Sequence, residues 1–198
     1  MKRVKKRERL ISSIDGSKRW AVFISGQGSN FRALSQSPHL AKIVLVLSSS
    51  INSPGILFAR RYGIPCKILE KPIDWKFVHS ILLEDHVDSI FLLGFMRILP
   101  SEFVNLWEKR MLNLHPSLLP DYPGLKSIER AFEARDNIGV TVHEVTAEMD
   151  AGPIVLQRIA VDKESVQRFN LSDVEFMTHV REQELICEGI FRWTSVKI

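Results

Sequence analysis

Short apolar runs alternate with segments of helical periodicity from Trp20 onward. Four of these runs are continuously hydrophobic and rich in branched side chains, at residues 20–25, 43–47, 89–93 and 111–115. Continuous rather than alternating hydrophobicity is typical of strands that are buried on both faces. The runs therefore predict a parallel sheet that is covered by helices on its two sides.

Four helices are predicted between these strands. Residues 30–37 and 54–62 follow Ser, Asn or Pro start signals, and residues 102–107 follow Pro100-Ser101. Residues 74–84 carry an apolar stripe at helical spacing, formed by Phe77, Val78, Ile81 and Leu82. The alternation of strand and helix predicts a doubly wound α/β fold.

The pattern changes in the last third of the chain. Residues 140–145 and 154–160 are predicted strands, and the segment Asp150-Ala151-Gly152-Pro153 between them is a turn signal. We expect them to form an antiparallel hairpin at the sheet edge, followed by one closing helix at residues 172–193. The predicted fold class is a single-domain doubly wound α/β fold with a mostly parallel sheet.

Composition supports one domain preceded by a charged segment. The chain has 198 residues, 45% of them hydrophobic, and a formal net charge of +4. Residues 1–19 hold eight Lys and Arg against two acidic residues, whereas the remainder is slightly acidic. We therefore divide the chain into a basic N-terminal extension, residues 1–19, and a domain at residues 20–198. The extension is expected to be solvated, although such an arm can also bind nucleic acid or anionic lipid.

The sequence also limits where the protein is expected to act and which partners it can have. No apolar run reaches the roughly 18 residues of a membrane span, and no signal-peptide pattern follows the basic start. The domain offers no basic stripe with interleaved aromatic residues, so nucleic acid is not expected as its main partner. These observations predict a cytoplasmic protein without a membrane partner.

A glycine-rich turn, Gly26-Gln27-Gly28-Ser29-Asn30, lies between the first predicted strand and helix. Backbone N–H groups at such a turn bind phosphate, helped by the positive end of the helix dipole. The turn has neither the full GxGxxG pattern of dinucleotide-binding proteins nor the lysine of a P-loop. The alternative is a tight turn with an asparagine cap.

An Asn-x-His pair occurs where the fourth predicted strand ends. Strand alternation places Asn113 and His115 on one face, at the carboxyl edge of the sheet where α/β proteins bind ligands. A carboxamide beside an imidazole is suited to stabilising an oxyanion. A carboxylate from Asp150 near His115 would raise the imidazole pKa and favour its cation. The local sequence equally fits a turn role for Asp150.

The segment 93–99 runs from a strand into a loop and offers an apolar wall with one cation, suitable for a flat heterocycle. Taken alone, it is a strand that leaves the core. Together with residues 24–30, 113–125, 141–146 and 149–157, it resembles the phosphoribosylglycinamide formyltransferase family, in consistent order over roughly residues 20–193.

The resemblance implies a role for each matching position. Asn113, His115 and Asp150 match the catalytic triad, and Gly28, Ser29 and Asn30 match the substrate-phosphate loop. Glu184 matches a position that engages the substrate amine. The folate-binding positions are Met96, Arg97, Ile98, Leu99, Val145, Thr146, Ala147, Glu148 and Met149.

The family further implies 10-formyltetrahydrofolate as co-substrate, a phosphorylated amine as acceptor and no metal. Asn113 and protonated His115 would stabilise the oxyanion that forms when the amine attacks the formyl carbon. Asp150 would support the imidazolium and position a water. Only small molecules are implied as partners, bound by a monomer or weak homodimer.

Several positions depart from the family pattern, namely Lys126-Ser127-Ile128, Ile138, Ala151 and Arg181. Glycinamide ribonucleotide is the expected acceptor, but a sibling enzyme acting on another amine, such as an aminosugar nucleotide, remains an alternative. So does a deformylase that hydrolyses formyltetrahydrofolate. A methionyl-tRNA formyltransferase would need a further C-terminal domain. A catalytically idle nucleotide-binding module is disfavoured, because all three triad residues are present.

Overall fold

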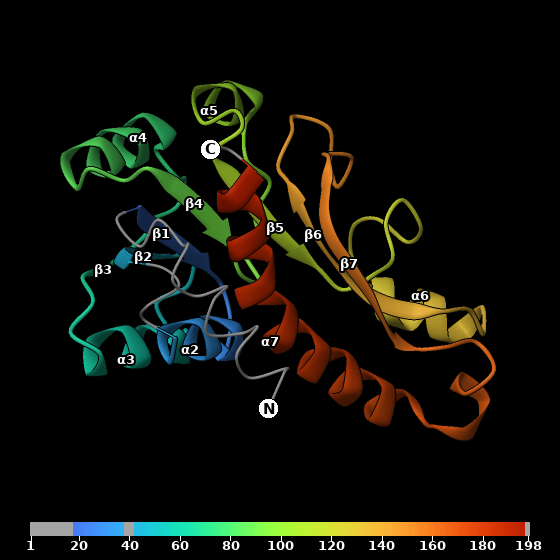
Figure 1. Cartoon of the computed structure of the whole chain (residues 1–198). Helices are drawn as coiled ribbons and strands as arrows, with labels where there is room; N and C mark the ends of the chain where they lie inside the picture. Colours follow the sequence, from blue (N-terminus) through green and yellow to red (C-terminus); the bar gives the residue numbers. More distant parts are fainter. Residues whose placement is uncertain (1–17, 38–41, 197–198) are drawn as a thin grey trace.

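A seven-stranded sheet forms the centre of the molecule in the computed structural model, which describes residues 18–37 and 42–196 (Figure 1). Its strands are β1 (Arg19–Ile24), β2 (Lys42–Ser48), β3 (Cys66–Ile68), β4 (Ser89–Leu92), β5 (Met111–His115), β6 (Ile138–Glu144) and β7 (Ile154–Val161). The spatial order is β3-β2-β1-β4-β5-β6-β7. The first five strands are parallel, whereas β6 and β7 run antiparallel to their neighbours.

Helices cover both faces of the sheet. They are α2 (Ser29–Ser35), α3 (Pro54–Arg61), α4 (Trp75–Glu84), α5 (Ser101–Leu106), α6 (Ser127–Glu133) and α7 (Leu171–Val196), with a 3-10 turn, η1 (Val166–Arg168). One buried cluster joins the sheet to α2, α3 and α7, and a second joins the opposite face to α4 and α5 (Figure 1). A smaller cluster ties α6 to the start of α7.

The predicted fold class is confirmed, including the antiparallel hairpin at the edge and the long closing helix. The sequence analysis did not predict β3, α6 or η1. Each is short, and α6 and η1 lie in polar segments without a long apolar stripe. The proposed extension at residues 1–19 falls almost entirely outside the described residues. Within the described residues, no helix has the length and apolar character needed to cross a membrane.

The strand order fixes where ligands can meet the sheet. It reverses between β1 and β4, which are neighbours although β2 and β3 separate them in sequence. At such a reversal the loops after the two strands diverge and leave a crevice. The loop after β1 carries Gly28, and the loop after β4 carries Met96. The change of direction at β6 then places His143 directly opposite Asn113.

Candidate active site

Asn113, His115 and Asp150 converge at the end of β5. Asn113 Nδ2 lies 3.4 Å from Asp150 Oδ1, and His115 Nδ1 lies 3.5 Å from Asp150 Oδ2. These separations exceed the roughly 2.7–2.9 Å of charge-assisted hydrogen bonds, so neither side chain is tightly bound to the carboxylate. The side chains of His115 and Asp150 are only 8% and 10% exposed, which strengthens their electrostatic interaction. The structure therefore brings the three predicted residues together around one carboxylate.

The loop between β6 and β7 carries Asp150 to this position. Asp150 has a left-handed backbone (φ 53), and its Oδ2 accepts a 2.8 Å hydrogen bond from the Gly124 N–H. Gly152 follows closely, and a Cβ there would lie only 1.8 Å from the Glu144 carbonyl oxygen. The loop can thus fold back against the end of β6 only because residue 152 is glycine.

The pKa values of Asp150 and His115 are both lowered, for different reasons. Burial raises the pKa of Asp150, but contacts with His143, the Gly124 N–H and His115 outweigh burial and lower it to about 2. Burial lowers the pKa of His115, and Asp150 and the Tyr122 carbonyl oppose this only in part. Asp150 acts in the expected direction and raises the pKa of His115, but desolvation of the ring is the larger effect and leaves that pKa below its ordinary value.

His143 is a fourth member of the cluster that the sequence analysis did not single out. Its side chain is 2% exposed, and its Nδ1 lies 2.9 Å from the Glu144 carbonyl oxygen, so Nδ1 carries the hydrogen. Its Nε2 lies 3.1 Å from Asn113 Nδ2 and 3.6 Å from Asp150 Oδ1. Because Nδ1 carries the hydrogen, the lone pair of Nε2 accepts from Asn113 Nδ2. Strand β6 is buried along nearly its whole length, so no alternation in its sequence marked His143 for this role.

The ring of His115 is also fixed from its second nitrogen. Nε2 lies 3.1 Å from the carbonyl oxygen of Tyr122, in the loop that follows β5. That loop is held by hydrogen bonds from Gln157 Nε2 to Leu119 O and from Thr141 Oγ1 to Ser117 O. The edge hairpin thus supports the loop that orients His115.

The predicted phosphate loop lies at the start of α2. Gly28 has φ 72, and a Cβ on it would come within 2.5 Å of Gly55 Cα. Both its backbone angle and the close approach of α3 therefore require glycine. Ser29 and Asn30 form the first turn of α2, and Asn30 Nδ2 donates to Glu182 of α7 at 2.9 Å.

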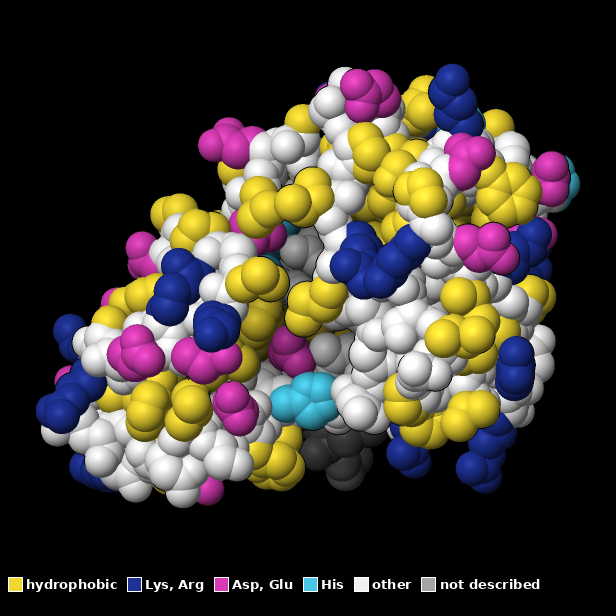
Figure 2. Space-filling view, turned by 180° about the vertical axis from the view of Figure 1, so that it is seen from behind, with side chains coloured by type: hydrophobic (Ala, Val, Ile, Leu, Met, Phe, Trp, Pro, Cys, Tyr) yellow, Lys and Arg dark blue, Asp and Glu magenta, His cyan; other side chains and the backbone are white. Residues whose placement is uncertain are grey.

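The predicted folate-binding positions form two largely exposed segments, one after β4 and one that leads directly to Asp150. Met96, Ile98 and Met149 are among the most exposed apolar side chains, at 66%, 78% and 57%. Arg97, Thr146, Ala147 and Glu148 are also exposed, whereas Leu99 and Val145 are half-buried against the core. Figure 2 shows this side of the molecule hollowed near its middle, with hydrophobic side chains along both margins of the hollow.

One hydroxyl connects the two loops that are predicted to bind the substrates. The Met96 N–H donates to Ser25 Oγ at 2.8 Å, and Ser25 Oγ lies 2.7 Å from Ser49 Oγ. Ser25 immediately precedes the glycine-rich turn. The start of the predicted folate wall is thus hydrogen-bonded to the residue that begins the phosphate loop.

Glu184 does not contact the triad. Its carboxylate pairs with Arg181 Nη1 at 2.5 Å on the exposed side of α7. The other departures from the family pattern have structural surroundings of their own. Ser127 Oγ donates to Pro116 O, Ile128 packs in the cluster around α6, and Ile138 is buried in β6.

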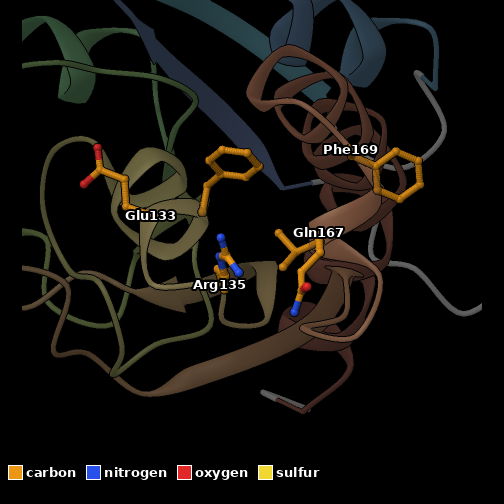
Figure 3. Close-up of a pocket in the computed structure, with 6 residues that line it drawn as sticks. Glu133, Arg135, Gln167 and Phe169 are labelled. Atoms are coloured by element: carbon orange, nitrogen blue, oxygen red, sulfur yellow. The ribbon is translucent and has the colours of Figure 1, made fainter.

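A separate pocket of about 390 Å³ lies between α6 and η1 (Figure 3). Figure 3 shows Arg135 and Gln167 near its middle, with Glu133 and Phe169 on opposite sides. None of the predicted site residues lines it, so it is distinct from the triad. Among residues 18–37 and 42–196, no group of three His, Cys, Asp or Glu side chains is arranged to hold a metal ion.

Comparison with known proteins agrees with this geometry. A family model described as formyl transferase matches residues 18–186. The phosphoribosylglycinamide formyltransferase of Haemophilus influenzae is 37% identical over 192 residues, which cover 89% of this chain and 86% of that protein. The trifunctional purine biosynthetic protein adenosine-3 of Homo sapiens is 39% identical over 150 residues. That match covers 70% of this chain but only 15% of the human protein, so the chain spans a small part of the trifunctional relatives.

Solved structures show the same similarity. The phosphoribosylglycinamide formyltransferase from Anaplasma phagocytophilum superimposes with a TM-score of 0.81 at 35% identity, covering 87% of this chain and 85% of that one. The protein of the same description from Bacillus halodurans gives 0.82 at 29% identity, covering 91% and 97%. By its fold and its site, the chain is an α/β protein with a mostly parallel sheet and an Asn-His-Asp cluster at the carboxyl edge of that sheet. The chain belongs to the formyl transferase family.

Proposed function

We propose that this protein transfers the formyl group of 10-formyltetrahydrofolate to the amine of glycinamide ribonucleotide, a step of purine biosynthesis. The observation that carries the proposal is the convergence of Asn113, His115 and Asp150 at the carboxyl edge of the sheet. The similarity to phosphoribosylglycinamide formyltransferases over most of the chain supports the same reaction.

The chain's own residues supply binding, orientation and proton transfer. His115 is a neutral imidazole at pH 7, since its pKa is lowered, and can accept the proton that the attacking amine releases. The cation that results lies between Asp150 and the Tyr122 carbonyl, both of which stabilise it. It returns the proton to the folate nitrogen as the bond between that nitrogen and the formyl carbon breaks. Asn113 donates to the oxygen on which negative charge develops. Asp150 remains ionised throughout, because its pKa is about 2.

The folate donor supplies the formyl group, and the surrounding residues fit a flat heterocycle. Met96, Ile98 and Met149 expose apolar surface beside the triad, and the irregular backbone of both segments offers hydrogen-bonding groups. Gly28, Ser29 and Asn30 bind the phosphate of the acceptor, and Glu184 engages its amine after leaving Arg181. The reaction requires no metal.

An acceptor-dependence assay tests the proposal. Release of tetrahydrofolate is followed by absorbance with glycinamide ribonucleotide, with an aminosugar nucleotide and with water as the only acceptor. We expect turnover with glycinamide ribonucleotide alone. Turnover with the aminosugar nucleotide would identify a sibling enzyme, and turnover in water would identify a deformylase.

His115→Ala tests the chemistry within this function. We expect kcat to fall about 100- to 1000-fold, because the group that accepts the proton of the attacking amine is removed. The circular dichroism spectrum should be unchanged, since the side chain lies at the edge of the core. A variant with full activity would exclude the mechanism.

The proposed setting follows from the same reaction. The substrates are small molecules, and the enzyme acts in the cytoplasm as a monomer or weak homodimer. Neither nucleic acid nor a membrane takes part in the reaction. Sedimentation of the purified chain at micromolar concentration measures the oligomeric state.

A further inference from the structure

A shielded carboxylate on α7 has no part in the chemistry described above. The side chain of Glu182 is 13% exposed, and its Oε2 accepts two hydrogen bonds. One comes from Asn30 Nδ2 at 2.9 Å, and the other from His179 Nδ1 at 2.8 Å. The amide of Gln183 contacts the second ring nitrogen of His179 at 3.2 Å. Glu182 thus links the closing helix to the first turn of α2.

This link determines how the Asn30 side chain is oriented. A carboxylate accepts hydrogen bonds and cannot donate them, so the amide must present Nδ2 to Glu182. The Oδ1 atom then points the other way, where it is buried and has no partner among the described residues. A buried acceptor without a partner is unfavourable. The orientation of Asn30 is therefore imposed by Glu182 against its own preference.

Other charged groups lie on the helices around this part of α7. On α7 itself, Arg181 pairs with Glu184, and Glu188 pairs with Arg158 of β7 and with Arg192. Asp173 and the exposed Glu175 precede His179 on the same helix. On α2, the guanidinium of Arg32 lies over the ring of Phe58. The charged residues of α6 are Glu129, Arg130 and Glu133.

None of these groups influences the pKa of His179. The hydrogen bond to Glu182 raises that pKa, burial lowers it less, and the charge of Glu182 adds to the rise. Glu182 and His179 therefore form an isolated pair beside the loop.

We propose that Glu182, together with His179, is a positioning residue that holds Asn30 and the adjoining Gly28-Ser29 turn in the conformation that binds the acceptor's phosphate. This inference rests on the proposed function, because it takes the turn as the phosphate loop. Glu182 touches neither substrate in this arrangement and acts through Asn30.

The pair also makes phosphate binding depend on pH. Below the raised pKa of His179, the imidazolium and the carboxylate cancel, and the loop faces a neutral neighbour. As the pH rises through that pKa, the pair gains a net negative charge close to the bound phosphate. The KM for the nucleotide should then rise about three- to tenfold, as expected for like charges separated by roughly 10 Å near a surface.

Two substitutions separate the hydrogen bond from the charge. Glu182→Gln keeps an oxygen that accepts from Asn30 but removes the charge, whereas Glu182→Ala removes both. Glu188→Gln on the same helix is the matched control, since Glu188 pairs away from the loop. For each protein, kcat and the KM of each substrate are measured from pH 6 to pH 9.

We expect Glu182→Ala to raise the nucleotide KM about tenfold at pH 7 while kcat and the folate KM stay within twofold. Glu182→Gln should keep a nucleotide KM near that of the unmodified protein at pH 7. Its rise in nucleotide KM should move to lower pH, because His179 still titrates but has lost the carboxylate that raises its pKa. The substrate's own phosphate contributes equally to both profiles. The Glu188→Gln profile should match that of the unmodified protein.

An unchanged nucleotide KM in Glu182→Ala, or an equal rise in the folate KM, would overturn the inference. If Glu182→Ala does not fold, an unaltered pH profile in Glu182→Gln is sufficient to overturn it. The proposed function fails in a different way, namely when the unmodified protein does not formylate glycinamide ribonucleotide. Calorimetric binding of that nucleotide to the same proteins then tests the inference without turnover, and absence of binding to the unmodified protein overturns both.

Discussion

Single side chains around Asp150 share one carboxylate, and contacts with its neighbours lower the pKa of that carboxylate. Asn113, His115 and His143 all lie within 3.6 Å of its oxygens. The carboxylate stays ionised because these contacts and the Gly124 N–H outweigh burial. The lowered pKa of Asp150 is therefore a property of the folded site, and its effect on stability in acid can be measured.

We expect Asp150 to contribute to stability above its ordinary pKa and to lose that contribution in acid. Its pKa falls from 3.8 to about 2 on folding, so the unfolded chain binds the proton first as the pH drops. The stabilisation is complete above about pH 4 and disappears towards pH 2, with a size of about 2 kcal/mol. The free energy of unfolding is measured with urea at pH 5 and at pH 2. Between these pH values the unmodified protein should lose about 2 kcal/mol more of it than Asp150→Asn.

The exposed residue Glu164 supplies the control for this measurement. Glu164→Gln should lose as much stability in acid as the unmodified protein, because the Asp150 cluster is unaltered. If Asp150→Asn and the unmodified protein lose the same unfolding free energy between pH 5 and pH 2, the effect does not come from Asp150.

His143 is expected to orient Asn113 for the reaction. His143→Leu removes the acceptor for Asn113 Nδ2, so the carboxamide can turn, and kcat should fall about tenfold or more. His143→Gln places an amide oxygen near the position of Nε2 and should recover part of the loss. The nucleotide KM should change little in both variants. Equal kcat values for the two variants would indicate that only packing matters at this position.

Among the elements, the glycine-rich turn and α3 are matched to each other by shape. Gly28 combines a left-handed backbone with a close approach to Gly55, whereas Gly63 has a similar φ of 66 but open space around it. The two glycines therefore separate backbone strain from steric contact within one molecule.

Gly63→Ala should cost about 1 kcal/mol of unfolding free energy, which is the typical penalty for a left-handed alanine. Gly28→Ala should cost about 3 kcal/mol, because α2 must also move away from α3. Urea denaturation measures both values, and the nucleotide KM should rise only for Gly28→Ala. Similar losses in the two variants would show that the contact with Gly55 relaxes freely.

At the scale of the whole molecule, the sequence predicted the elements that have strong patterns. Four of the five parallel strands, five of the helices and the edge hairpin were confirmed, because each carries a continuous apolar run, a helical stripe or a helix start signal. The short elements β3 and α6 were missed, since tertiary packing rather than local pattern stabilises them. The convergence of Asp150 with His115, separated by 35 positions in the printed sequence, could be expected only from the family resemblance.

The protonation of the site could not be predicted in the same way. Burial, which dominates the pKa of His115, is a property of the assembled layers and not of neighbouring residues. The partnership of Glu182 with Asn30 likewise arises where α7 crosses α2, 152 positions apart in sequence. The residue type therefore indicates which chemistry a side chain can carry out, whereas its surroundings in the fold determine its ionisation state.

The Ser25 hydroxyl between the two loops has a consequence for how the substrates bind. Because it bonds the Met96 N–H and adjoins the glycine-rich turn, ordering one loop also orders part of the other. Calorimetry should therefore show that each substrate tightens the other, by about fivefold and by the same factor in both directions. Ser25→Ala should reduce this factor towards one, whereas Ser80→Ala on α4 should not. Such reciprocity would favour the complex that holds both substrates over the complexes that hold only one. It would thereby limit hydrolysis of the formyl donor by water.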